Sequence, residues 1–173
     1  MRYTARTFET ARTNISDRER EKISRYKTKD VSALLRQNIN SDNSYWRILT
    51  QATYILFHHP NPISRHESAF VLGELKYRCG VDQVTSISNL RLVVRRDSSM
   101  VVKHEAAEAL GEIHCIASIG AAADLAKIIA FHKYHEDVVA TAKGSLDMII
   151  DYLKKKGYNS TVNELREWSR ERK

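Results

Sequence analysis

Apolar residues recur every three to four positions along nearly the whole chain, which is the period of an amphipathic α-helix. No strand-like alternation bounded by Asn-Gly or Asp-Gly turns interrupts this pattern. The chain has only two prolines, which are the residues that break helices most strongly. The pattern therefore predicts an all-α protein without a β-sheet, organised as a single domain over residues 1–173.

Start and stop signals divide this pattern into about eight helices. Asn61-Pro62 is typical of a helix start, with proline at the first helical position. Gly157 is typical of a residue that follows a helix end, and Thr161 with Glu164 matches a capping box for a last helix. A long charged helix is expected over residues 18–38. The other helices are expected to begin near residues 44, 62, 82, 99, 119, 136 and 161.

A repeated phrase shows how these helices are organised. Residues 64–75 and residues 102–113 share the pattern basic-His-Glu-x-Ala-x-x-Leu-Gly-Glu-aliphatic, and the two histidines, His66 and His104, are 38 residues apart. A match of this length at a fixed interval indicates a helical repeat. We expect a solenoid of about four helix pairs, in which pairs at 63–95, 99–131 and 136–171 stack in register.

The repeats are expected to differ in role along the chain. The His-Glu repeats occupy residues 61–150, between a charged N-terminal helix region at 1–40 and a basic C-terminal capping helix at 158–173. The third repeat has Ala140-Thr141 where the others have His-Glu. Plainer repeats at the ends fit a stack of helix pairs, because such stacks need atypical units to cap them.

The His-Glu pairs suggest chemistry rather than packing. Equivalent helices of neighbouring repeats lie about 8–10 Å apart, so His66 and His104 are expected to face a common space. Two imidazoles and one carboxylate form a facial triad with open positions, which suits a transition-metal ion. Ser64 and Glu67 also fit a capping box, which gives Glu67 a structural explanation. Glu105 has Val102 three residues before it and therefore lacks that explanation.

The span from about residue 61 to residue 150 resembles one half of deoxyhypusine hydroxylase, a HEAT-repeat family with a di-iron centre. The resemblance lies in Arg65-His66-Glu67 followed by Leu72-Gly73, and in the phrase at residues 100–111. It implies a HEAT-like fold and a monooxygenase that completes hypusine by hydroxylating a lysine-derived side chain on a protein substrate. It also implies that His66, His104 and Glu105 bind the iron. Glu67 would lie beside these ligands or face the substrate, and would act as a catalytic or a metal-binding carboxylate.

This chain departs from that family in one important respect. The family has four His-Glu motifs in two halves, whereas this chain has two motifs. One chain would therefore hold one Fe²⁺, and a di-iron centre would need a homodimer. The alternative is a non-catalytic HEAT-repeat scaffold, similar to the phycobilisome-lyase type, that binds a protein partner on its concave face. The ligand types alone leave iron and zinc both open.

The distribution of charge along the chain limits the classes of partner that we expect. The net charge is +7, but an excess of +4 lies in residues 1–30 and of +3 in residues 151–173, so the middle of the chain is neutral. Nucleic acid is a less favoured partner on this basis, because the central helices have a single basic cluster, Arg91, Arg95 and Arg96. The sequence has no apolar run long enough to cross a membrane.

The N-terminal residues and the number of cysteines indicate the cellular compartment in which we expect the protein. The N-terminus lacks the apolar core of a secretory signal. Cys79 and Cys115 are the only cysteines, which is too few for a disulfide framework. We therefore expect the reducing cytoplasm.

Overall fold

The computed structural model describes residues 15–36, 42–75, 81–131 and 134–170, and every regular element in these ranges is helical. This confirms the predicted all-α class for the described ranges. None of these helices is long and apolar enough to span a membrane. The elements are α2 (Asp17–Ser24), α3 (Thr28–Ser32), the 3₁₀ helix η1 (Ala33–Arg36), α4 (Asp42–His58), α5 (Pro62–Glu74), α6 (Val81–Arg96), α7 (Met100–Glu112), α8 (Ser118–Ala130), α9 (Glu136–Lys155) and α10 (Asn159–Trp168).

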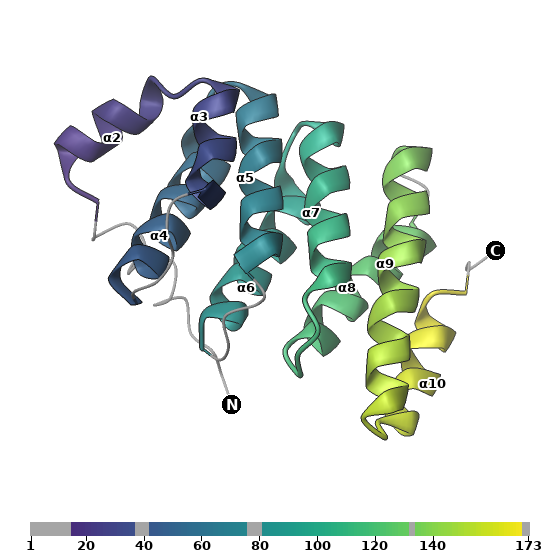
Figure 1. Cartoon of the computed structure of the whole chain (residues 1–173). Helices are drawn as coiled ribbons and strands as arrows, with labels where there is room; N and C mark the ends of the chain where they lie inside the picture. The colour runs from purple at the N-terminus through teal and green to yellow at the C-terminus, as the bar shows by residue number, and fades with distance from the viewer. Residues whose placement is uncertain (1–14, 37–41, 76–80, 132–133, 171–173) are drawn as a thin grey trace.

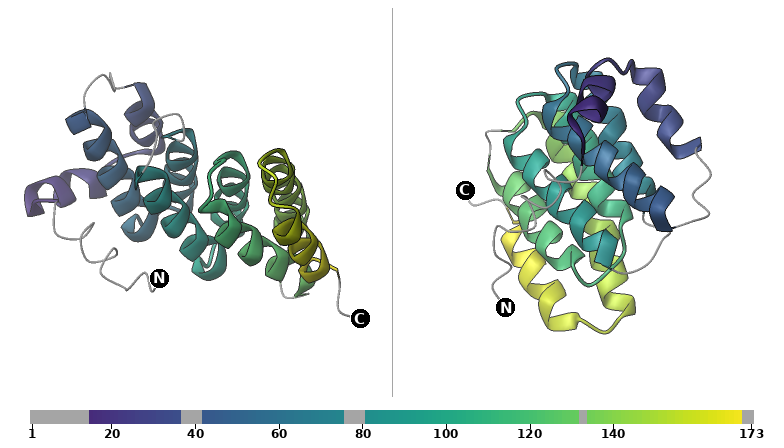
Figure 2. Two further views of the ribbon diagram at one scale, coloured as in Figure 1. Left: turned by 90° about the horizontal axis from the view of Figure 1, so that it is seen from below. Right: turned by 90° about the vertical axis from the view of Figure 1, so that its left-hand side faces the viewer.

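The helices form two layers. In one layer α5 packs between α3 and α7, and α7 packs against α9; in the other, α6 packs between α4 and α8, and α8 packs against α10. Figure 1 shows α5, α7 and α9 side by side, and Figure 2 shows that the helices follow one another along the molecule in chain order. The repeat predicted from the sequence is thus matched by neighbouring helices that pack in succession.

Glycine and small residues bring the helices of the first layer close together. A Cβ atom at Gly73 of α5 would lie 2.9 Å from the Cβ atom of Ala109 on α7. A Cβ atom at Gly111 of α7 would lie 2.6 Å from that of Ser145 on α9. Real Cβ atoms do not approach this closely, so Leu-Gly in the repeated phrase is explained by packing.

The core lies between the two layers. In α7, Ala106, Ala107 and Leu110 are fully buried, and the equivalent stretch of α5 buries Ala69 and Leu72. The helices of the second layer contribute larger aliphatic residues from their inner faces, among them Ile48, Ile55, Leu90, Val94, Leu125 and Ile128. Burying each such side chain stabilises the fold by about 1.5–3 kcal/mol.

An ion pair connects the two turns that precede the His-Glu helices α5 and α7. The Arg65 guanidinium donates through Nε and Nη2 to the two carboxylate oxygens of Asp97, at 2.9 and 3.0 Å. It also donates through Nη1 to the carbonyl oxygen of His59 at 2.9 Å. Both partners are largely buried. Arg65 therefore links the turn before α5 to the turn before α7, and fixes the starts of both helices.

The long N-terminal helix expected over 18–38 is wrong in the described part of that span. The helix starts as expected, with a capping box between Ser16 and Glu19, but α2 ends at Ser24. Lys27 is extended, and its backbone N–H donates to the Asp30 carboxylate at 2.8 Å. This Asp30 cap starts a second short helix, and Tyr26 and Thr28 are weak helix formers at the break.

The capping box expected at Thr161 and Glu164 is also absent. The last helix begins at Asn159, two residues earlier, with Tyr158 as its N-cap. Gly157 has φ +83° and reverses the chain directly after α9, so α10 starts at once and Thr161 lies inside it. The predicted stop at Gly157 is confirmed. Cys79 lies outside the described residues, and Cys115 is a half-buried free thiol.

Candidate metal centre at the seam of α5 and α7

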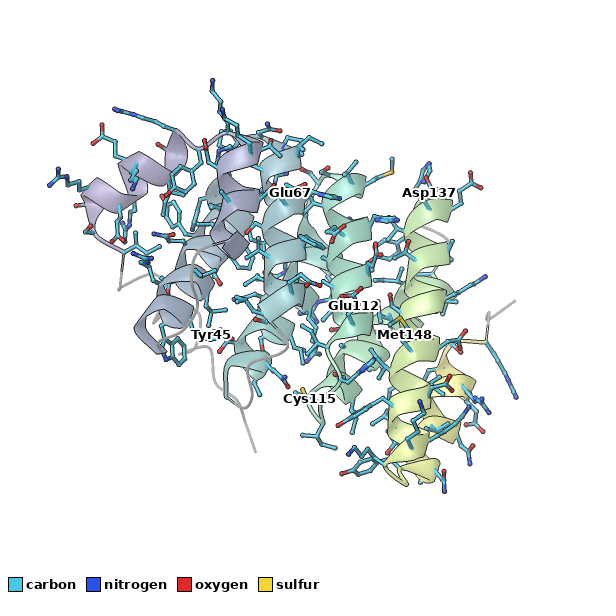
Figure 3. The ribbon with its side chains drawn as sticks, viewed as in Figure 1. Tyr45, Glu67, Glu112, Cys115, Asp137 and Met148 are labelled. Carbon is cyan, nitrogen blue, oxygen red and sulfur yellow. The ribbon has the colours of Figure 1, made fainter. Side chains whose placement is uncertain are left out.

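The two His-Glu pairs lie on neighbouring helices, as their register predicts. His66 and Glu67 belong to the second turn of α5, and His104 and Glu105 belong to the second turn of α7. Both helices begin at a fixed turn and approach each other closely at Gly73, so the pairs are held at one seam. Figure 3 shows Glu67 near the upper end of α5 and Glu112 near the lower end of α7.

His66 reaches across the seam to Glu105. Its Nε2 atom lies 3.1 Å from an oxygen of the Glu105 carboxylate. Its Nδ1 atom is buried and has no hydrogen-bond partner, since the nearest carboxylate oxygen of Glu67 is 3.8 Å away, which is too far for a hydrogen bond. A buried imidazole nitrogen without a partner is costly, and is one mark of a site that binds something.

His104, Glu105 and Glu108 form the one cluster of three potential metal ligands in the described part of the chain. Each offers a donor atom, and these atoms all lie within 4.8 Å of one another. Glu105 is buried, whereas the side chains of His104 and Glu108 are 42% and 52% exposed. The cluster therefore opens to solvent on one side. His66 is not a member of this cluster, and approaches it only through Glu105.

The electrostatics of the seam centre on Glu105. The pKa of the Glu105 carboxyl is raised from its ordinary 4.5 to about 7, first by burial and then, in decreasing order of effect, by the nearby carboxylates of Glu108, Glu67 and Glu112. An ionised Glu105 is thus unfavourable by itself because it is poorly hydrated and surrounded by like charge. A cation among these carboxylates would remove both penalties.

Glu67 has a different role from the one its sequence context suggests. Ser64 does not cap the helix, since it is fully buried and its Oγ atom lacks a hydrogen-bond partner. Asn61 is the actual cap and accepts a hydrogen bond from the backbone N–H of Ile63 at 3.0 Å. The Glu67 carboxylate instead accepts a hydrogen bond of 2.6 Å from the Ser32 hydroxyl on α3. The N-terminal region therefore orients a residue of the candidate site.

The third repeat supplies no comparable group at its equivalent positions. Thr141 donates its hydroxyl hydrogen to the backbone oxygen of Asp137 at 3.0 Å, within α9. His135 is the N-cap of α9, and its Nδ1 atom accepts from the backbone N–H of Asp137 at 3.3 Å. His135 is therefore a cap residue, and it is out of register with His66 and His104.

Two contributors were not assigned from the sequence. Glu108 is not among the predicted ligands, although its spacing of four residues from His104 places the two on one helix face. Ser32 could not have been found, because its distance of 35 residues from Glu67 matches no repeat interval. Glu105 is the residue that both histidines approach, and so has the central place in the cluster.

The comparisons with known proteins add no further constraint. No protein-family model, no curated protein and no solved structure matches this chain. The function is therefore argued from the geometry of the seam.

Proposed function

We propose that this chain is a HEAT-like repeat protein that binds one divalent transition-metal ion at the seam of α5 and α7. His104, Glu105 and Glu108 would provide the main ligands, and His66 would complete or support the set. The observation that carries the proposal is the buried Glu105 carboxylate, which lies beside the His66 imidazole and within 4.8 Å of donor atoms of His104 and Glu108.

The repeat architecture supports the HEAT-like part of this proposal. Each glycine of the repeated phrase meets a small residue on the next helix of the same layer. The small residues that they meet, Ala109 and Ser145, are themselves 36 residues apart, close to the interval of 38 between the glycines. One packing arrangement therefore recurs along the molecule, as expected of stacked helix pairs.

The residues present fit a metal ion chemically. Imidazole nitrogens together with carboxylate oxygens suit iron, zinc or manganese better than calcium or magnesium, which prefer oxygen alone. The His66 Nδ1 atom has no partner within the protein. Burial first, and the neighbouring carboxylates second, raise the pKa of Glu105, and a dication would offset both effects on the ionised carboxylate.

The resemblance to deoxyhypusine hydroxylase makes iron our first choice of metal and a lysine-derived protein side chain our choice of substrate. Ferrous iron would supply activation of dioxygen for a hydroxylation. The protein would bind the cationic substrate through carboxylates that are not needed as ligands, with Glu67 as the substrate-facing residue and Ser32 holding its carboxylate in place. The side chains of His104 and Glu108 are about half exposed, so the cluster is accessible from solvent.

The metal assignment is tested by analysing protein purified without an affinity tag. We expect up to one iron or zinc ion per chain in the wild type. His104→Ala should lose at least one of three ligands and so most of the bound metal, with its helical circular dichroism unchanged. His135→Ala is the matched control, because His135 is a cap residue outside the cluster. Equal metal content in His104→Ala and wild type would rule out the ligand assignment.

The second candidate function is a non-catalytic scaffold for a protein partner. It is favoured by exposed apolar side chains on the two His-Glu helices, namely Ile63, Phe70, Met100 and Val101. Exposed apolar residues of this kind often mark interaction surfaces. A metal-free protein whose Phe70→Ser variant loses partner binding, while Glu105→Gln keeps it, would favour the scaffold over the metal site.

A further inference from the structure

A second charged site lies on the opposite layer, between α6 and α8. Arg91 and Arg95, one turn apart on α6, both reach Asp124 on α8. Arg91 donates through Nε to one carboxylate oxygen at 2.6 Å, and Arg95 donates through Nη1 to the other at 3.3 Å. Asp124 is almost fully buried. One buried carboxylate thus holds two arginines next to each other.

The adjacent turn of α8 is also shaped around Arg91. A Cβ atom at Gly120 would lie 2.5 Å from Nη1 and 2.9 Å from Cζ of Arg91. The guanidinium therefore occupies space that any other residue at position 120 would fill. Asp124 and Gly120 together fix the orientation of Arg91, so its position does not depend on a ligand. A fixed guanidinium loses little entropy when it binds an anion.

The positive charge here exceeds what Asp124 can neutralise. Arg96 follows Arg95 on the side of α6 that faces α4, and Lys127 lies one turn after Asp124 on α8. Both side chains are exposed, and neither forms an ion pair with the described residues. Two of these four cations pair with the one buried carboxylate, and the four follow one another from the α4 side of α6 to α8.

A groove adjoins the α4 end of this row. It has a volume of about 450 Å³, and its lining includes Phe57 and His58 of α4, Leu92 and Arg96 of α6, and the ion pair of Arg65 with Asp97. Aromatic and apolar walls beside an unpaired arginine can accept a planar base next to a phosphate. The groove is open to solvent, which suits a segment of a polymer better than an enclosed small molecule.

We propose that this surface, formed by Arg91, Arg95, Arg96 and Lys127, binds the phosphates of a single-stranded nucleic acid, with a base in the groove against Phe57 and His58. A row of cations across two helices matches a repeating phosphate backbone, whereas a small phosphate compound would need cations that converge on one point. Nucleic acid was the less favoured partner in the sequence because Arg91, Arg95 and Arg96 form a single basic cluster; Lys127, which the fold adds to them, is distant from the three arginines along the chain.

The test is fluorescence anisotropy with a labelled 20-nucleotide single strand between 50 and 200 mM NaCl. With three cations left after neutralisation by Asp124, log K should fall against log salt with a slope of about −2. The double variant Arg96→Gln/Lys127→Gln should reduce this slope to about −0.7. Lys143→Gln/Lys155→Gln removes the same charge from exposed positions of α9, in the other layer, and should keep the wild-type slope.

Gly120→Ala sharpens the test because it leaves the net charge unchanged. The new methyl group should displace the Arg91 guanidinium, so binding should weaken while helical content and net charge stay the same. Glu105→Gln should bind the strand like the wild type, which separates this surface from the metal centre.

Several results would overturn the proposal. The first is that the single-stranded nucleic acid does not bind at 50 mM NaCl. The second is that the α9 control variant reduces the salt slope as much as Arg96→Gln/Lys127→Gln does, which would mean that only the overall charge matters. Equal affinity for inorganic pyrophosphate at matched ionic strength would assign the surface to a small phosphate compound instead. Equal affinity for polyglutamate would assign it to an acidic protein.

Discussion

At the scale of single residues, the chemistry of the seam depends on one carboxyl group. Glu105 is held beside the His66 imidazole at 3.1 Å while three other carboxylates surround it. In a protein without bound metal, such a group favours its protonated form. The stability of the metal-free protein should therefore report the ionisation of Glu105.

The sign of that dependence follows from the raised pKa. The Glu105 pKa is about 7 in the folded state against 4.5 ordinarily, so the folded state binds this proton more tightly than the unfolded state. The contribution of Glu105 to the free energy of unfolding is complete below about pH 4.5, and is lost as the pH rises through 7. The loss should reach about 3 kcal/mol at most.

This prediction is checked by urea unfolding of EDTA-treated protein at pH 5 and pH 8. Glu105→Gln, which stays neutral at both values, should show a smaller decrease in stability than the wild type between them. Glu164→Gln changes an exposed glutamate of α10 and should behave like the wild type. Identical pH profiles for the wild type and Glu105→Gln would show that Glu105 is ionised in both states.

At the scale of helices, the spacing of α5, α7 and α9 depends on the glycines of the repeated phrase. Gly111 is the strictest case, because an added Cβ atom would lie 2.7 Å from the backbone Cα atom of Ser145 and could not be relieved by a side-chain rotation. Gly144 on α9 is the opposite case: it is exposed and has no heavy atom within 4 Å of an added Cβ.

The two glycines should respond in opposite directions to the same substitution. Gly111→Ala should force α7 and α9 apart and lower the free energy of unfolding by about 1–3 kcal/mol. Gly144→Ala should raise it by about 0.5–1 kcal/mol, because alanine has less backbone freedom to lose in a helix. Chemical denaturation measures both values. If Gly111→Ala left the free energy of unfolding unchanged, α7 and α9 would be able to move apart without loss of stability.

The helices could largely be predicted from the sequence, whereas part of the site could not. The spacing of apolar residues and the caps at Asn61 and Gly157 predicted the central helices, because those signals act within a few residues. The break after Ser24 was missed, since it depends on the Asp30 side chain capping Lys27. The repeat interval predicted that the two His-Glu helices are neighbours, with His66 facing His104, whereas the contact of His66 with Glu105 was not predicted. Ser32 did not, because its contact with Glu67 depends on how α3 packs against α5.

At the scale of the whole molecule, the open side of the cluster bears on assembly. The described residues provide one group of three ligands, and a site with two metal ions about 3.5–4 Å apart would need a second such group. A twofold dimer that joins the α5–α7 faces of two subunits would provide it. His104 and Glu108 are exposed enough to meet a partner subunit.

We therefore expect aerobic loading with Fe²⁺ to shift the protein from monomer to dimer in sedimentation velocity, with up to one iron per subunit. His104→Ala should stay monomeric after the same loading, because the shared site would be incomplete. A wild-type protein that binds iron and remains strictly monomeric would exclude a di-iron centre. It would leave a site with a single metal ion.

The succession of neighbouring helices has a consequence for how the molecule opens. Each helix of the α3, α5, α7 and α9 layer packs mainly against the next one. Thermal unfolding can therefore begin at either end of the stack and spread towards its middle. Amide hydrogens of α2 and α10 should exchange with solvent first, and those of α7 last. Because Glu105 and His104 lie on α7, the candidate metal site would keep its geometry in partly opened molecules. A partner could remodel α10 without disturbing the site, whereas a change in α3 would release Glu67 from Ser32.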